Sequence, residues 1–220
     1  MSASLSTELI NLFASLLLLI AFAMLAQRRV LSLIYLFAWQ GAVLALNTSL
    51  VAFVTDQHHL YYSALLTLVL KVILLPWILH RLIDKLNVRW DVETLVNIPT
   101  TMLIGVVLVI IGFNVAMPIS HLSETVTQGT LGIALACVLL SFMMMITRRK
   151  AVPQVIGFLA MENGLFFAAT SATYGMPLVV ELGVALDVLV ATFIFGIFTF
   201  HLREAFDSLD IEHIEKLKER

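Results

Sequence analysis

The sequence predicts an all-α, polytopic membrane protein with about seven transmembrane helices. Of its 220 residues, 60% are hydrophobic and 13% are charged, which is about half the charged share of an ordinary soluble domain. The mean hydropathy is +1.00, and a soluble domain of this size needs a more polar surface than that composition supplies. Helices are expected because a membrane-spanning segment must pair its backbone polar groups internally.

Seven segments are apolar over the roughly 20 residues that a spanning helix needs. They are residues 8–26, 30–54, 60–82, 98–118, 127–147, 152–173 and 177–202. We do not expect the first to be a cleaved signal peptide, because no Lys or Arg precedes it and Arg28 and Arg29 follow it.

Basic residues follow only the first, third, fifth and seventh segments. They are Arg28, Arg29, Arg81, Lys85, Arg89, Arg148, Arg149, Lys150, Arg203, Lys216, Lys218 and Arg220. Cytoplasmic loops of membrane proteins carry the excess of Lys and Arg. The sequence therefore predicts that the amino terminus lies outside and the carboxyl terminus lies in the cytoplasm. The net charge of −2 gives no indication of nucleic-acid binding.

Two parts of the chain resemble each other, which predicts a duplicated three-helix unit. Gln40 and Glu162 are each followed eight residues later by Thr-Ser. Lys71 and Asp187 then occupy similar depths in the next segment. A single spacer helix between the units makes the repeat parallel rather than inverted. The predicted parts are the units 1–90 and 123–203, the spacer 91–122 and an amphipathic cytoplasmic tail, 204–220; chance similarity is the alternative.

Three ionisable residues lie near the middle of predicted spans: Lys71, Glu162 and Asp187. A charge at that depth costs about 2.5–3.5 kcal/mol on insertion scales. A buried ion pair that fixes helix packing is one interpretation, but such pairs add little net stability. We therefore favour a proton relay in which Glu162 and Asp187 exchange protons and Lys71 tunes them. Glu181 lies nearer the start of its helix and is a secondary carboxylate.

Other polar residues are weaker candidates for the same relay. Gln40 lies within a span, while His80 and His201 lie near the predicted cytoplasmic ends of their helices. For the histidines, a polar interfacial side chain is the alternative. No metal-ligand cluster, phosphate-binding glycine loop or nucleophile–base pair is apparent, so we expect neither a metal, nor a cofactor, nor enzymatic activity of the chain itself.

Glycine and proline residues mark the surroundings of two of these charges. Gly157 and Gly164 are seven residues apart, on a helix face roughly opposite Glu162. We expect another helix to approach closely there. Pro76 follows Lys71 by five residues and is expected to disturb the helix beside the lysine.

At these residues the sequence resembles the membrane-subunit family called hydrogenase-4 component E. The resemblance covers most of the chain. It rests on four features: the stretch Gly157–Gly164 with its Met-Glu-Asn-Gly motif, the spacing from that motif to Glu181 and Asp187, the Lys-Val-Ile-Leu-Leu-Pro run that begins at Lys71, and the tail segment around Ser208-Leu-Asp210.

The resemblance implies a membrane subunit of formate hydrogenlyase-type hydrogenase complexes, which look like respiratory complex I. The carboxyl half is similar to the K (4L) subunit of complex I, whose two intramembrane glutamates map best onto Glu162 and Asp187, with Glu181 as the alternative to Asp187. The implied partners are antiporter-like and other membrane and cytoplasmic subunits in a bacterial or archaeal cytoplasmic membrane.

Three other functions remain open from the sequence. The chain could be a scaffold between the hydrogenase arm and the antiporter-like subunits, or a subunit of a related ion-translocating or cation/proton antiporter complex. A self-sufficient transporter is less favoured, because the polar residues of the two predicted units have diverged. The sequence leaves open whether H⁺ or Na⁺ is moved.

Overall fold

The computed structural model describes residues 3–86, 92, 94–120 and 130–173. The chain divides into two compact units, Met1–Gly183 and Val184–Arg220. All described residues belong to the first unit. The predicted segment 177–202 and the tail 204–220 lie outside the described residues, and the predicted three-helix repeat stays a prediction.

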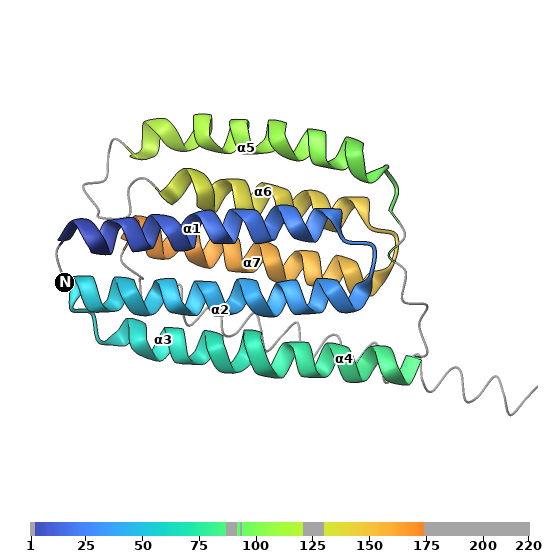
Figure 1. Cartoon of the computed structure of the whole chain (residues 1–220), viewed down its shortest axis with the longest axis horizontal. Coiled ribbons are helices and arrows are strands. Elements are labelled where there is room, and N and C mark those ends of the chain that lie inside the picture. The colour runs from blue at the N-terminus through green and yellow to red at the C-terminus, as the bar shows by residue number, and fades with distance from the viewer. Residues whose placement is uncertain (1–2, 87–91, 93, 121–129, 174–220) are drawn as a thin grey trace, which may run out of the picture. The chain divides into compact units, whose positions relative to one another are not determined.

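The described part of the chain is helical throughout, with no strand beyond one isolated bridge between Thr94 and Arg148. The helices are α1 (Ala3–Ala26), α2 (Val30–Thr55), α3 (His59–Thr67), the π-helix η1 (Leu68–Leu74), α4 (Leu75–Leu86), α5 (Ile98–Ser120), α6 (Leu131–Thr147) and α7 (Ala151–Thr173). α3, η1 and α4 follow one another without a break and form one long rod (Figure 1).

Five of these helical segments are long and apolar enough to cross a membrane. They are Leu5–Ala26, Val30–Thr55, His59–Arg81, Ile98–Pro118 and Ala151–Ser171. α6 is apolar but shorter, with 17 residues. The all-helical, multi-pass architecture predicted from the sequence is confirmed for this part of the chain, while the total of seven spans stays a prediction.

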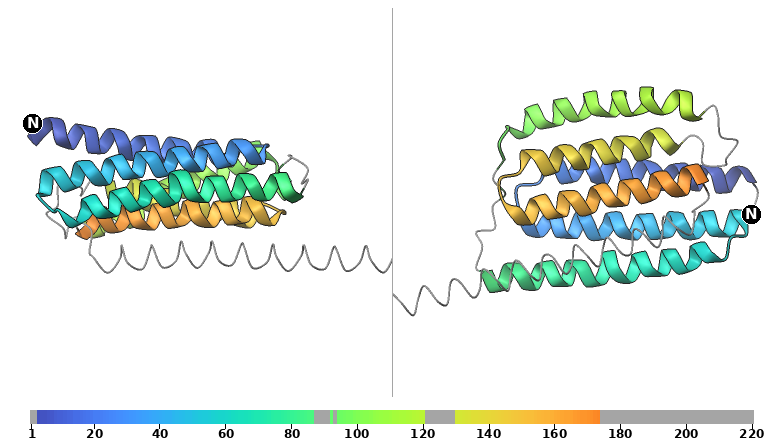
Figure 2. Two further views of the ribbon diagram at one scale, coloured as in Figure 1. Left: turned by 90° about the horizontal axis from the view of Figure 1, so that it is seen from below. Right: turned by 180° about the vertical axis from the view of Figure 1, so that it is seen from behind.

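The helices lie side by side in a layered bundle. α5 forms one edge and packs on α6, and the α3–α4 rod forms the opposite edge beside α2 (Figures 1 and 2). Between the edges, α1 packs on α2 and α6, and α7 packs on α6 and α2. Helices α2 and α7 run in the same direction through the bundle (Figure 1).

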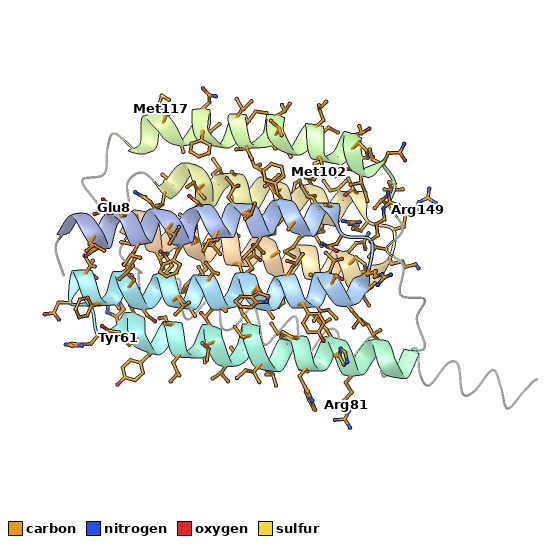
Figure 3. All side chains as sticks on the ribbon, viewed as in Figure 1. Glu8, Tyr61, Arg81, Met102, Met117 and Arg149 are labelled. Atoms are coloured by element: carbon orange, nitrogen blue, oxygen red, sulfur yellow. The ribbon has the colours of Figure 1, made fainter. Side chains whose placement is uncertain are left out.

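Three connections meet at one end of the bundle. The Val92 amide donates to the Arg28 carbonyl over 2.7 Å, and the Leu95 amide donates to the Thr147 carbonyl over 2.8 Å. We call this the basic end, because it holds Arg28, Arg29, Arg148, Arg149 and Lys150. At the opposite end, called the far end, α2 finishes and α3 begins. Figure 3 shows Arg81 and Arg149 toward the basic end and Glu8 and Tyr61 toward the far end.

A buried arginine ties α1 to α6 at the basic end. Arg148 is 1% exposed, and its guanidinium donates to the carbonyls of Met24, Leu25 and Gln27 over 2.8–3.1 Å. These carbonyls end α1, where helix carbonyls lack donors within their own helix. Burial lowers the pKa of Arg148 to about 10. The side chain therefore stays charged at neutral pH.

The outer surface carries many large apolar side chains, as a lipid-facing surface does (Figure 3). α5 is the most exposed of these five segments, since 22% of its apolar 18-residue stretch is buried. Leu103 on α5, Trp39 on α2 and Tyr62 on α3 are each more than 60% exposed. In water such a surface would be unfavourable, whereas in a bilayer it is matched by the surrounding hydrocarbon.

Glycines set the distance between α6 and α7, as predicted. A Cβ atom added to Gly157 would lie 3.1 Å from the Met145 backbone nitrogen, and one added to Gly164 would lie 3.0 Å from that of Val138. The two helix backbones therefore nearly touch along this face. Glu162 lies on another face of α7 and points away from α6, toward the rod that contains Lys71.

Candidate functional site

A buried ion pair joins the α3–α4 rod to α7. Lys71 Nζ of η1 lies 3.2 Å from Glu162 Oε1 of α7, and both side chains are 5% exposed. The structure thus brings together two of the charges predicted from the sequence, 91 residues apart in the chain. Because both groups are withdrawn from water, each depends on its neighbours for stabilisation of its charge.

The backbone around Lys71 is a π-helix. The amide of Leu75 donates to the carbonyl of Leu70, five residues earlier. The next residue, Pro76, has no N–H and its ring would clash with the Val72 carbonyl in a regular α-helix. The wider π-helical turn relieves that clash. The disturbance expected from Pro76 is therefore a π-helical turn beside Lys71. π-Helical turns are rare and occur often at functional sites.

A glycine on α2 allows η1 to come close. A Cβ atom added to Gly41 would lie 3.1 Å from Lys71 Cβ and 3.4 Å from Val72 Cγ2. The first of these distances is tighter than ordinary van der Waals contact, and the second is at its lower limit. Gly41 therefore brings the lysine backbone against α2, next to Gln40.

Gln40 takes part in a second buried contact, beside the ion pair. Asn163 Nδ2 donates to Gln40 Oε1 over 3.2 Å, and both residues are 1% exposed. Asn163 directly follows Glu162 on α7. The two positions that the sequence pairs as equivalents, Gln40 and Glu162, therefore lie at the same level on neighbouring parallel helices.

Some buried amide atoms near the site have no hydrogen-bond partner. Within the described part of the chain these include both polar atoms of Asn47 and Oδ1 of Asn163. An unsatisfied buried polar group costs about 1–3 kcal/mol. Such groups in a native fold call for an explanation, and a bound water is one.

The other predicted relay residues are His80, which the structure describes, and three residues that it does not. Asp187, Glu181 and His201 lie outside the described residues, so their roles stay predictions. His80 is exposed on α4, nine residues beyond Lys71 and toward the basic end. Among the residues that the structure describes, no group of three or more His, Cys, Asp and Glu could hold a metal ion.

A comparison with known sequences provides a close relative. The uncharacterized protein Rv0085 of Mycobacterium tuberculosis is 34% identical to the chain over 204 residues, which cover 92% of this chain and 93% of that protein. The chain belongs to the Rv0085 family.

More distant similarity extends from this member of the Rv0085 family to hydrogenase-4 component E. The proteins of that name from Escherichia coli and Shigella flexneri are 23% identical to it over 148 residues, or 67% of this chain and 68% of theirs. No protein-family model matches the chain. No solved structure matches it significantly.

Two residues of the site in this Rv0085-family chain were not expected from the sequence. Asn163 lies within the Met-Glu-Asn-Gly motif, and its position beside Glu162 was the available signal. Asn47 lies seven residues after Gln40, which is two helical turns along the same face. Asn47 would have been found by following the face of Gln40 along its helix, and Asn163 by considering the residue next to Glu162.

The arrangement is suited to holding a proton. Movement of a proton from the Lys71 ammonium to the Glu162 carboxylate converts two buried charges into two neutral groups. The electrostatic gain of the pair and its loss of hydration oppose each other. The balance between the charged and neutral forms is therefore sensitive to any further charge or water molecule that approaches.

Proposed function

We propose that the chain is a non-catalytic membrane subunit of a hydrogenase-like, complex I-like assembly, and that Glu162 and Lys71 take part in coupled proton translocation there. The similarity to hydrogenase-4 component E supports a subunit of such an assembly. Its partners would be antiporter-like and other membrane and cytoplasmic subunits, and its location a bacterial cytoplasmic membrane. It would bind no cofactor of its own.

The observation that carries the proposal is the Lys71–Glu162 ion pair, which lies within two long apolar helices. Charged groups in that position are costly and mark ion or proton pathways in membrane proteins. Glu162 would exchange the proton and Lys71 would set how readily it does so. Asp187 would be the second exchanging carboxylate, with Glu181 and His80 in secondary roles.

The test replaces each carboxylate by its amide in the intact complex. Glu162→Gln and Asp187→Asn are each expected to lower the proton gradient formed per redox turnover, measured in inverted membrane vesicles with a pH-sensitive dye. Glu8→Gln removes an exposed carboxylate at the far end of α1 and is the matched control. An unchanged ratio of protons to turnovers in both relay variants would refute the proposal.

A structural role is the second candidate, because the same ion pair ties the α3–α4 rod to α7. Removing one member of a buried pair leaves an uncompensated charge, whereas removing both is far less damaging. If the pair serves packing, Lys71→Met combined with Glu162→Gln should restore both assembly and proton coupling. If it serves translocation, the double variant should assemble but remain uncoupled.

A further inference from the structure

Buried polar side chains are distributed unevenly along α2. Between the basic end and the level of the ion pair, the buried side chains of α2 are all apolar: Val30, Leu33, Ile34 and Phe37. From that level to the far end, α2 buries three polar side chains: Gln40, Asn47 and Thr48. The change occurs where Gln40 meets Asn163.

The neighbouring helices show the same division at the same level. α7 buries Ile156, Leu159 and Ala160 before Glu162, but Asn163, Thr170 and Ser171 after it. The rod buries Ser63 and Thr67 on the far side of Lys71, and Leu75, Leu79 and Ile83 on the basic side. Among the described side chains of α2, α7 and the rod, the buried polar ones therefore lie at the level of the pair or on its far side, between apolar ones such as Leu44 and Phe167, whereas the basic side buries only apolar ones.

α6 departs from this division, because it buries Thr147 at the basic end and the buried Arg148 follows it there. Both are hydrogen-bonded within the protein: the Thr147 hydroxyl donates to the Met143 carbonyl, and the Arg148 guanidinium donates to carbonyls at the end of α1.

The buried Ser141 of α6 lies between Val138 and Met145, the two residues that pack against Gly164 and Gly157. That places Ser141 near the level of the ion pair rather than deep in the apolar half. At the far end of the same helix, the hydroxyls of Thr130 and Ser171 lie 2.9 Å apart.

Asn47 shows what the polar half is able to bind. Its side chain is 1% exposed, and neither its oxygen nor its nitrogen has a hydrogen-bond partner. The adjacent Thr48 hydroxyl donates to the Leu44 carbonyl of its own helix. A ligand that satisfies Asn47 must therefore both donate and accept hydrogen bonds, and it must be small enough for a packed interior. Water meets these requirements.

We propose that the far half of the bundle holds a file of water that enters between α2 and α7, binds at Asn47 and leads to the Lys71–Glu162 pair, while the basic half is a dry seal. The use of this water by protons rests on the proposed function. The inference adds the side from which protons reach Glu162. Exchange with the basic side then requires a change of conformation or a route through another subunit.

The Gln40–Asn163 hydrogen bond closes this path beside Glu162. The crevice beside it, lined by Leu17, Gln40, Cys137, Asn163, Gly164 and Phe167, has no room for a water molecule as it stands. Asn47 lies seven residues beyond Gln40, about 10 Å along α2, so the file of water would cover that distance before it meets the amide–amide contact beside Glu162. Separation of Gln40 from Asn163 would complete the path and expose Asn163 Oδ1 to it.

The test measures the access of a water-sized cation from each face of the membrane. In a Cys137→Ser background, Asn47→Cys is compared with Phe37→Cys in the assembled complex, in membrane vesicles of both orientations. Silver ion is the probe, and its reaction is measured as protection from later maleimide labelling in denaturant. Gln57→Cys, in the exposed α2–α3 connection, identifies the far face.

We expect Asn47→Cys to react at least ten times faster from the Gln57 face than from the other, and Phe37→Cys to react from neither. Thr48→Cys replaces Asn47→Cys should the latter fail to assemble. Lack of reaction at both polar positions, or reaction at Phe37→Cys from the basic face, overturns the inference. Access is measured without redox turnover, so normal coupling in Glu162→Gln would refute the proposed function and leave this result standing.

Discussion

At the scale of single residues, Arg148 is the side chain whose burial most needs an explanation. It is among the largest fully buried side chains of the described part, and no carboxylate there lies within ion-pair distance of it. The carbonyls at the end of α1 take that place, since a helix carries partial negative charge at its carboxyl end. Arg148 therefore acts as a cap for α1 supplied from the end of α6.

Replacement of Arg148 is expected to destabilise the bundle. Arg148→Gln loses the three hydrogen bonds to the end of α1 and should lower the free energy of unfolding by about 3 kcal/mol, since hydrogen bonds to charged groups contribute about 1.5–3 kcal/mol each and are not additive. Arg148→Lys should recover only part of the lost free energy of unfolding, because one ammonium group cannot reach all three acceptors. Unfolding of the purified protein in detergent measures the change.

The neighbouring residue provides the control for this prediction. Arg149 is exposed at the same end of the bundle, and Arg149→Gln should change stability by no more than about 0.5 kcal/mol, as is usual for surface substitutions. Equal losses for Arg148→Gln and Arg149→Gln would show that net charge at this end matters and the cap does not.

The candidate site could be predicted in part from its residues. Lys71 and Glu162 stand out because each is a charge within an apolar run, and Gln40 was found through the repeated Thr-Ser spacing. Their mutual geometry could not be predicted, because it depends on the rotation of each helix about its axis. That rotation is poorly encoded when lipid-facing and buried faces are equally apolar. That Asn163 is the hydrogen-bond partner of Gln40 could be learned only from the structure.

At the scale of elements, two glycine contacts set how closely the helices of the site approach. At Gly41 the atom nearest to an added Cβ is Lys71 Cβ, 3.1 Å away, whereas at Gly164 a Val138 methyl group lies at 2.9 Å and the Val138 backbone nitrogen at 3.0 Å. The contacts at Gly164 are the closer ones, and they include a backbone nitrogen, which cannot move without its packed helix. The α6–α7 contact is therefore the less adaptable of the two.

Alanine substitutions should distinguish these contacts. Gly164→Ala is expected to cost about 1–3 kcal/mol of stability through overpacking against α6. Gly41→Ala should cost less than about 1 kcal/mol, because the gain in helix propensity, about 0.5–1 kcal/mol, offsets a milder contact. Thermal unfolding in detergent measures both. A larger loss for Gly41→Ala would mean that η1 is the more rigid element.

At the scale of the whole molecule, the apolar segments of the sequence predicted where the helices lie along the chain, but not which helices pack against each other. The predicted spans 30–54, 98–118 and 152–173 match α2, α5 and α7 within two residues, because each is an apolar run bounded by polar residues. The order of helices across the bundle, with α5 at one edge and α2 beside α7, could not be predicted. In a bilayer both lipid and protein provide apolar surroundings, so hydrophobicity does not specify which helix packs on which.

Orientation in the membrane is the whole-molecule property on which the sidedness of the site depends. The basic end gathers Arg28, Arg29, Arg148, Arg149 and Lys150, and the positive-inside rule predicts that this end faces the cytoplasm. An epitope inserted at Gln57 should then be accessible to antibody in intact spheroplasts, and one inserted at Arg29 only after permeabilisation. The opposite pattern would reverse the orientation. Water-borne protons would then reach Glu162 from the cytoplasm, and the apolar half of the bundle would seal the site from the outside.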